Sequence, residues 1–501
     1  MYRLMSAQEA VSFIKDGDNI VVNSFLALSH PEALEDALFE RFLKSGSPSG
    51  LTVMSTAGFG SWREDRNFEP LVASGAVKRV VSSHYSTMPI TTKKALDNEI
   101  EAYCLPLGVI SHLIRSQAGG KNGLFSKVGL GLFVDPRQEG PGINERSKEK
   151  FVSLMEIDKE EYLFYRMPRP NVALIKGTTV DVAGNISFEN EYITGDALSI
   201  AQAVKAAGGK VLVQVDRVSH YFSRPRNVIV PGMLVDAVVV AEPTENHKAS
   251  QALSGDIHVP PAHMPYWMDK LASSSKKRDS KDNSANIIGE RAARELKEGD
   301  IVNIGIGYPE NVGKYALESG KISQITLTVE AGGIGGVPAS GTAFGATIGA
   351  DMVSDISMQF DFYDGSGLDI CFMGALEVDK HGNVNAHKMT GRYAGIGGFA
   401  NITGATKTVV FCFTMTTKGL VAKLENGNVS IENEGSIIKI KEHINSISFS
   451  AKQALKNGQR VLYVTERCVF ELTENGLKLK EVYPGVDEKT QIRDILDFEL
   501  A

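Results

Sequence analysis

Short apolar runs alternate with amphipathic stretches along the whole chain. Continuous runs rich in β-branched residues are typical of strands that are covered on both faces of a sheet. Four such runs span 172–175, 211–213, 237–240 and 408–411. Helical patterns cover 197–207 and 286–296. Alternation of strands and helices predicts an α/β fold with largely parallel sheets, in which binding sites lie at the carboxyl ends of the strands.

The second half of the chain repeats motifs of the first half in the same order. Both halves contain a Lys-acid-Gly-Asp turn, a Pro-Glu helix start, a Leu-Thr-Val run before Ala-Gly, and an Asp-x-x-Gly-Asn turn. The matching segments are 15–21 with 297–302, 31–32 with 309–310, 51–58 with 327–332, and 181–186 with 379–384. The separation between partners shortens steadily along the chain. This pattern predicts an internal duplication with insertions in the first half.

A polar, charge-rich segment without periodicity, 273–283, lies between the two halves. It is typical of a solvated linker, although its three adjacent basic residues could also form a phosphate-binding or targeting patch. We therefore expect an N-terminal half at 1–268, a linker at 269–284 and a C-terminal half at 285–501. No role can be assigned to the last segment, 451–501, from its pattern.

Composition narrows the class of partner. The chain of 501 residues has 53 Lys and Arg against 60 Asp and Glu, with no long basic stripe. That balance argues against nucleic acid as a partner. Its start has no apolar core of a signal peptide, and no apolar run reaches the length of a membrane span, so we expect no membrane partner.

The four cysteines are scattered and form no CxxC pair: Cys104, Cys371, Cys412 and Cys468. This distribution fits neither a disulfide framework nor a metal site, and it favours a reducing, cytoplasmic compartment. In contrast, the 49 glycines concentrate after strand-like runs. Glycines in those places are typical of small-molecule sites that use backbone amides.

One carboxylate follows a predicted strand directly. The strand 325–329 leads into Glu330, and the glycine-rich turn 331–338 comes next. No Lys or Arg occurs from Ile322 to Asp379. A weakly solvated carboxylate without an ion pair is a better nucleophile than a paired one. The alternative is a glutamate that simply faces water or pairs with an arginine far away in the sequence. In the first half, Thr56 takes the corresponding position.

Two clusters of small residues could supply backbone donors to a developing oxyanion near such a carboxylate. One follows the strand around 301–302 and precedes a predicted helix, and the other lies downstream, within 393–399. They comprise Gly305, Ile306 and Gly307, and Gly395, Gly397 and Gly398. A lone GxG is met in many ordinary turns, and the first-half counterpart, 23–26, lacks these glycines.

These motifs together resemble the family I CoA-transferases, and most of all the single-chain acetate/propionate type of short-chain acyl-CoA transferase. The resemblance covers nearly the whole chain. The motifs that carry it are 328–338, 359–365, 377–385 and 395–399 in the second half, and 129–137 and 177–185 in the first. It implies two similar tandem α/β domains of the NagB-RpiA-like kind, arisen by duplication.

The resemblance also implies a function. In that family a glutamate, here Glu330, attacks an acyl-CoA to give an acyl-glutamyl anhydride and then a glutamyl-CoA thioester, which a second carboxylate resolves in a ping-pong cycle. The amides of Gly305–Gly307 and Gly395–Gly398 match the oxyanion and CoA-contacting positions. The expected partners are acyl-CoA and short carboxylates such as acetate or propionate. No metal or other cofactor is implied, because CoA is a substrate, and a homo-oligomer, dimer or tetramer, is expected.

The chain departs from the family where the acceptor acid is expected to bind. Residues 82–86 read Ser-Ser-His-Tyr-Ser instead of a Gly-Gly-His-Trp-Gly-like loop, and 339–345 lacks a larger residue before its Phe. His84 could orient the acceptor carboxylate or be structural. Two other functions remain open: an acyl-CoA hydrolase using the same thioester, and a non-catalytic sensor of an anionic metabolite on a similar scaffold. The preferred substrates, and the groups that hold the nucleotide of CoA, are not encoded in recognisable motifs.

Overall fold

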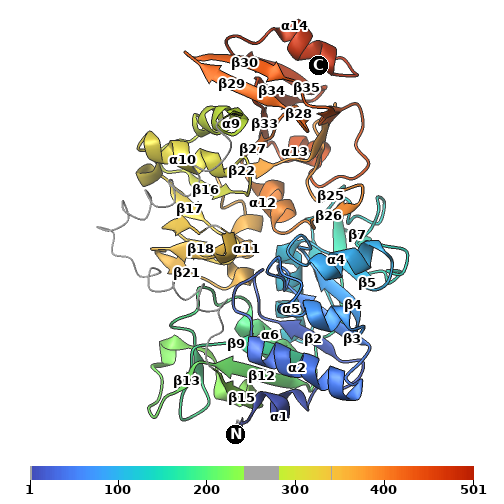
Figure 1. Cartoon of the computed structure of the whole chain (residues 1–501), viewed down its shortest axis with the longest axis vertical. Coiled ribbons are helices and arrows are strands. Elements are labelled where there is room, and N and C mark those ends of the chain that lie inside the picture. The colour runs from blue at the N-terminus through green and yellow to red at the C-terminus, as the bar shows by residue number, and fades with distance from the viewer. Residues whose placement is uncertain (1–2, 242–280, 340) are drawn as a thin grey trace.

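The computed structural model describes residues 3–241, 281–339 and 341–501. The chain forms two stacked halves, each built on a large sheet with helices packed against it (Figure 1). The first half carries the N-terminus at the bottom of the view, and the second half carries the C-terminus at the top. The expected linker at 269–284 lies mostly outside the described residues.

The sheet of the first half has eight strands, and all neighbouring pairs are parallel. In spatial order they are β1 (Arg3–Leu4), β15 (Ala237–Val240), β12 (Lys210–Val215), β9 (Val172–Lys176), β2 (Asn19–Val22), β3 (Leu51–Ser55), β4 (Val77–Ser82) and β5 (Glu101–Cys104). Every residue of β3 and β9 is buried. Burial on both faces explains why these strands appear in the sequence as continuous apolar runs.

The sheet of the second half has nine strands. In spatial order they are β21 (Met352–Val353), β18 (Gly333–Ile334), β17 (Thr326–Thr328), β16 (Ile301–Ile304), β22 (Ile370–Gly374), β27 (Thr408–Cys412), β33 (Arg460–Val464), β34 (Cys468–Thr473) and β35 (Gly476–Val482). Strands β17 to β33 are parallel, and the strands outside them are antiparallel. The last fifty residues, which had no assigned role, thus supply one edge of this sheet.

The internal duplication is confirmed by the strand order. Reading β3-β2-β9-β12-β15 in the first half and β17-β16-β22-β27-β33 in the second, the chain visits the five positions in the same sequence order. The repeated Asp-x-x-Gly-Asn turn is also built identically. In both halves Oδ1 of the aspartate, Asp181 or Asp379, accepts from the backbone N–H groups two and four residues later. Its Oδ2 accepts from the amide of Asn185 or Asn383, and all six distances lie between 2.8 and 3.0 Å.

The two predicted helices are present, with shifted ends. Helix α6 (Ala197–Ala206) ends one residue before the predicted 207, whereas α9 (Ser284–Ala293) begins two residues before the predicted 286 and ends three residues before the predicted 296. The reason is that the N–H groups of Arg294 and Glu295 donate to carbonyls three residues back, which tightens the chain into turns. The other helices are α1 (Ala7–Val11), α2 (Glu32–Ser45), α3 (Glu69–Ala73), α4 (Pro89–Leu96), α5 (Leu107–Ala118), α10 (Glu310–Glu318), α11 (Ile356–Asp364), α12 (Phe399–Ala405), α13 (Ala451–Lys456) and α14 (Glu488–Gln491).

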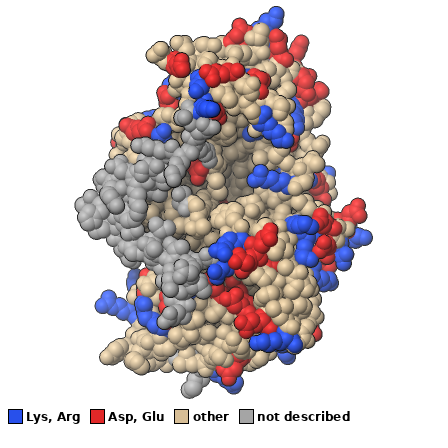
Figure 2. Space-filling view, in the orientation of Figure 1, with Lys and Arg blue, Asp and Glu red and all other residues tan. Residues whose placement is uncertain are grey.

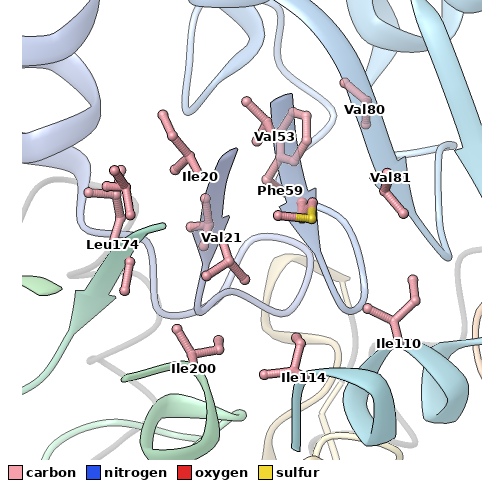
Figure 3. Packing of buried hydrophobic residues seen from close by; sticks show 14 of the residues in the cluster. Ile20, Val21, Val53, Phe59, Val80, Val81, Ile110, Ile114, Leu174 and Ile200 are labelled. Carbon is pink, nitrogen blue, oxygen red and sulfur yellow. The ribbon is translucent and has the colours of Figure 1, made fainter. Parts of the chain in front are cut away.

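The core of the first half lies between the sheet and its helices. Ile110 and Ile114 of α5 and Ile200 of α6 extend toward the sheet, in which Val21 of β2 lies on the facing side (Figure 3). All four side chains are excluded from solvent. This packing fixes α5 against the sheet and presents its other face to the second half.

Helices α5 and α11 join the two halves. A Cβ at Gly108 of α5 would come within 2.4 Å of the Phe360 ring on α11, so the helices approach closely only because this residue is glycine. At the end of α5, Arg115 makes a two-pronged ion pair with Asp361, at 2.7 and 2.9 Å. The halves therefore meet through a specific contact next to the ends of the second sheet.

Candidate active site

A cavity of about 380 Å³ lies between the two halves, and it contains all seven residues that the sequence marked as candidates. Figure 2 shows the surface hollowed between the upper and lower parts of the molecule. The second half contributes the carboxyl ends of its strands, with Glu330, Gly305, Ile306, Gly307, Gly395, Gly397 and Gly398. The first half closes the cavity with Phe25, Leu26, Ala57, His84 and Leu107.

A tight turn after β17 places Glu330 in this cavity. The N–H of Val329 donates to the carbonyl of Gly333 at 2.8 Å, and the N–H of Gly332 donates back to Val329 at 3.0 Å. Gly332 has a φ of +109°, and a Cβ there would lie 1.9 Å from the Ser354 carbonyl oxygen. Only glycine can therefore close this turn.

Polar contacts below the turn fix the end of β17. Tyr363 of α11 donates its hydroxyl hydrogen to Thr328 Oγ1 at 3.1 Å. The side-chain amide of Asn303 donates to the Thr328 carbonyl at 3.2 Å. These buried bonds restrict the strand that carries the carboxylate, so Glu330 projects from a rigid support.

Glu330 is a half-buried carboxylate with one hydrogen bond and, among the described residues, no ion pair. The backbone N–H of Gly398 donates to its Oε2 at 3.2 Å. Burial raises the pKa of Glu330 to about 7, and the bond from Gly398 opposes that rise. The alternative that Glu330 pairs with an arginine distant in sequence finds no support in the described part of the chain.

The predicted amide clusters are present, but most of their N–H groups already have acceptors. The engaged donors are Gly395 to His387, Gly397 to Ser83, Gly305 to Phe372 and Gly307 to the Glu310 carboxylate. These bonds hold the loops in place, since the loop around Gly395 must dock on the first half. The expectation that every one of these amides could stabilise an oxyanion therefore needs correction.

Two amides remain suited to that role. The N–H of Gly398 faces Glu330, and the N–H of Ile306 makes no hydrogen bond within the described residues. A Cβ at Gly398 would lie 2.6 Å from Glu330 Oε2. Glycine at this position is thus what allows the carboxylate to touch the backbone.

His84 reaches the cavity from the first half as a neutral imidazole. Its Nε2 lies 2.6 Å from Ser86 Oγ, and burial lowers its pKa to about 4. The next residue, Tyr85, donates its N–H to the Ala394 carbonyl at 2.8 Å, which docks this loop on the Gly395 loop. His84 is therefore a wall residue of the cavity with hydrogen-bonding capacity and no charge.

The other candidate nucleophiles near the cavity are cysteines, and they are poorly suited. Cys412 lines the cavity and Cys371 lies on the adjacent strand, both buried. Burial raises the pKa of the Cys371 thiol to about 12 and that of Cys412 higher still. Thiolates are the reactive form of cysteine, so Glu330 is the ionised nucleophile that this cavity offers near neutral pH.

Sequence reasoning missed one charged residue of the site, Lys439, which also lines the cavity. It lies between β31 (Ile437–Ile438) and β32 (Ile440–Lys441), in a segment with no recognisable motif. Among the described residues no group of three or more His, Cys, Asp or Glu side chains could hold a metal ion. None of the described helices is both long and apolar enough to cross a membrane.

Comparison with known proteins identifies relatives over the whole length. Residues 4–241 and 285–489 match the family model described as Coenzyme A transferase. The chain is 38% identical over 497 residues to acetate CoA-transferase YdiF of Escherichia coli strain K12, covering 99% of this chain and 92% of that one. It is also 38% identical over 513 residues to the caffeate CoA-transferase of Acetobacterium woodii, covering 100% and 95%.

A solved structure agrees with these matches. The structure of the E. coli O157:H7 acyl-CoA transferase YdiF in a thioester complex with CoA superimposes with a TM-score of 0.89 at 35% identity. The superposition covers 100% of this chain and 93% of that one. Fold and sequence therefore point to the same set of proteins.

Proposed function

The chain belongs to the coenzyme A transferase family, and from this we propose that it moves CoA from a short-chain acyl-CoA to a carboxylate such as acetate or propionate, through a glutamyl-CoA thioester on Glu330. The enzyme is a CoA-transferase. One observation carries the assignment of its nucleophile: Glu330 is a carboxylate without an ion pair among the described residues, held by a glycine turn against a backbone amide.

The proposed cycle balances without any other reactant. An ionised oxygen of Glu330 attacks the thioester carbonyl, the C–S bond breaks, and CoA leaves as a thiolate from an acyl-glutamyl anhydride. The thiolate attacks the glutamyl carbonyl and expels the first carboxylate, which leaves the glutamyl-CoA thioester. The acceptor carboxylate repeats both steps in reverse, so the enzyme ends as it began and no cofactor is consumed.

Backbone amides stabilise the charge that appears in these steps. Each attack turns a carbonyl oxygen into an oxyanion, and a fixed N–H donor nearby favours that state over the ground state. Gly398 is placed for the glutamyl carbonyl because it already contacts Glu330. We assign the carbonyl of the acyl group to Ile306, which follows the adjacent strand β16 and whose N–H makes no hydrogen bond within the described residues.

Burial of Glu330 also serves the chemistry. A carboxylate in water is strongly solvated, and that solvation must be lost before it can attack a carbonyl. In this cavity part of the desolvation is complete on folding, as the raised pKa of Glu330 indicates. The cost is that a fraction of the enzyme is protonated near neutral pH.

The choice of acid remains the finer question. The two relatives at 38% identity are named for acetate and for caffeate, two acids of very different size. The two segments where this chain departs from the family motif, 82–86 and 339–345, contribute His84 and Phe344 to the cavity wall. We propose that these side chains select the acid, and we expect small ones to be preferred.

The experiment is a matrix of acyl-CoA donors against carboxylate acceptors, from acetate to caffeate, with product acyl-CoA measured directly. Transfer that depends on the acceptor supports the proposal. Acyl-CoA loss at the same rate without any acceptor would instead indicate a hydrolase, in which water resolves the thioester. A homo-oligomer and a cytoplasmic location remain predictions; the four buried, free cysteines fit a reducing compartment.

A further inference from the structure

Lys439 lines the same cavity as Glu330 but comes from a different part of the sheet edge. Its backbone N–H donates to the Met415 carbonyl, and its own carbonyl accepts from the N–H of Val378, at 2.8 and 2.9 Å. These partners follow β27 and β22, whereas Glu330 follows β17. The Lys439 ammonium lies 5.3 Å from the centre of the Phe413 ring.

The strand order gives the scale of the separation. Between β17 and β22 or β27 lie two or three strand spacings, because the order is β17-β16-β22-β27. At about 4.8 Å per spacing, Lys439 and Glu330 are on the order of 10–14 Å apart along the strand ends. The side chain agrees with this separation, because the Lys439 ammonium lies against Phe413 and Glu330 is not among the carboxylates that raise its pKa. Any role of the ammonium therefore concerns a part of the substrate remote from the reacting carbonyl.

The Lys439 ammonium has no hydrogen bond or ion pair within the described part of the chain. The carboxylates that influence it, Glu377 and Glu466, have other partners. Glu377 pairs with Lys441, and Glu466 pairs with Arg467 at 2.7 Å. Within the same described residues, Lys439 is the one lysine or arginine that lines the cavity.

A buried ammonium group without a hydrogen-bond acceptor costs free energy, because it has lost part of its hydration. Burial lowers the pKa of Lys439 to about 8, and the two carboxylates only partly oppose this. The side chain is still charged at neutral pH, with less water around it than a surface lysine has and no protein acceptor in its place. A group of this kind gains free energy when a ligand brings an anion to it.

We propose that Lys439 is a substrate-binding residue that pairs with a phosphate of CoA in the part of the cavity remote from Glu330. This inference rests on the proposed function, because the thioester must meanwhile reach Glu330. CoA joins its thiol to its phosphates through the long pantetheine arm, so it can span the cavity, whereas acetate or propionate bound at Glu330 cannot. The chain has a net charge of −7, which makes a local cation valuable for a polyanionic substrate.

The test compares two acetyl donors, acetyl-CoA and S-acetylpantetheine, which lacks the phosphates. Lys439→Met removes the charge at similar length, and Lys439→Arg keeps it. The control is Lys441→Met, which removes a neighbouring lysine that pairs with Glu377 instead of lining the cavity. Thermal unfolding checks that each variant is folded.

We expect Lys439→Met to raise KM for acetyl-CoA about tenfold or more, as for loss of a charge-assisted hydrogen bond, with kcat little changed. KM for S-acetylpantetheine should not change in Lys439→Met. Lys439→Arg should have a KM for acetyl-CoA close to that of the wild type. Calorimetry should show weaker binding of free CoA to Lys439→Met. An unchanged KM for acetyl-CoA, or an equal rise for both donors, would overturn the phosphate contact.

A dicarboxylic acid offers the same anionic chemistry from another source. If Lys439→Met impairs only transfer to or from succinate, the lysine binds a distal carboxylate and the phosphate contact is wrong. Failure of the proposed function would look different, because the wild-type enzyme would then transfer no CoA with any donor, while calorimetry would still report the effect of Lys439 on CoA binding.

Discussion

Thr56 donates its hydroxyl hydrogen to Asp196 across 3.0 Å, at the place in the first half that corresponds to the contact of Glu330 with Gly398 in the second. Thr56 follows β3 as Glu330 follows the equivalent strand β17, and Asp196 precedes α6 as Gly398 precedes α12. The carboxylate of the pair thus follows the strand in the second half but precedes the helix in the first half.

The exchange gives the two equivalent places different tasks. Asp196 is buried and accepts from Ser111, Thr56 and the backbone N–H of Ser357, which belongs to the second half. The Asp196 carboxylate therefore accepts hydrogen bonds from three protein groups, whereas the Glu330 carboxylate accepts one and faces a cavity. One copy of the duplicated site has become part of the contact between the halves, and the other has kept an open site.

Asp196→Ala should destabilise the protein, because three donors lose their acceptor at once. With about 1–3 kcal/mol for each buried group left unsatisfied, we expect a loss of at least about 2 kcal/mol in urea unfolding. Asp65→Ala, which removes an exposed partner of Arg63, serves as the control and should cost under about 1 kcal/mol. Equal effects of the two substitutions would show that the Asp196 contact does not hold the halves together.

Glu330→Gln should abolish CoA transfer, since an amide cannot form the anhydride. Shape and hydrogen bonding are nearly retained, so thermal unfolding and CoA binding should stay close to wild type. Glu318→Gln, at the exposed end of α10, is the matched control and should keep full activity. Turnover by Glu330→Gln at the wild-type rate would remove this residue from the mechanism.

Gly398→Ala should lower kcat by about tenfold or more, because its Cβ would meet Glu330 Oε2 at 2.6 Å and displace the carboxylate. Gly397 offers a contrast: its Cβ would meet nothing within 4 Å, but its φ of +52° strains any other residue. Replacing Gly397 by Val should therefore lower the rate by about an order of magnitude because it distorts the loop. Loss of an oxyanion donor would not be the cause, since the Gly397 N–H already donates to the Ser83 carbonyl. Steady-state kinetics with a folded Gly398→Ala protein at wild-type kcat would contradict the contact.

The pH dependence should report the burial of Glu330. Its pKa is raised to about 7, so the carboxyl group is protonated and unreactive below that pH. In the free enzyme kcat/KM should fall tenfold per unit below about pH 7, and it should decline again above about pH 8, where Lys439 loses the charge that is proposed to bind CoA. The measurement is kcat/KM for acetyl-CoA from pH 5.5 to 8.5. If kcat/KM instead fell only near pH 4.5, the ordinary pKa of a glutamate, Glu330 would be solvated and not buried.

Much of this fold is visible in the sequence because strands buried on both faces must be apolar throughout. Runs such as 172–175 and 408–411 therefore predict strands, and motifs shared by the halves predict the duplication. The predicted end of α9 was wrong because helix ends depend on which carbonyl groups accept the last N–H groups, and the periodicity of the sequence does not reveal those partners. Glu330 was found because a strand, an acid and glycines stand together in the sequence.

Other parts of the site depend on contacts between distant segments. Sequence alone marks the amide of Gly397 as a donor, but it cannot show that the Ser83 carbonyl of the other half has already taken it. Lys439 lies next to no motif, and only folding brings it to the cavity that contains Glu330. Residues of this kind become visible once the sheet order is known.

The most direct test of the account is the covalent intermediate itself. Enzyme mixed with acetyl-CoA and no acceptor should stop half-way, with CoA attached, and intact-mass measurement should show an adduct that disappears on addition of acetate or propionate. Peptide mapping should place the adduct between Ile322 and Lys380, on Glu330, since the Cys371 thiol in that segment is buried with a pKa raised to about 12. An adduct on Cys371, or none under conditions in which the enzyme turns over, would contradict the glutamyl thioester.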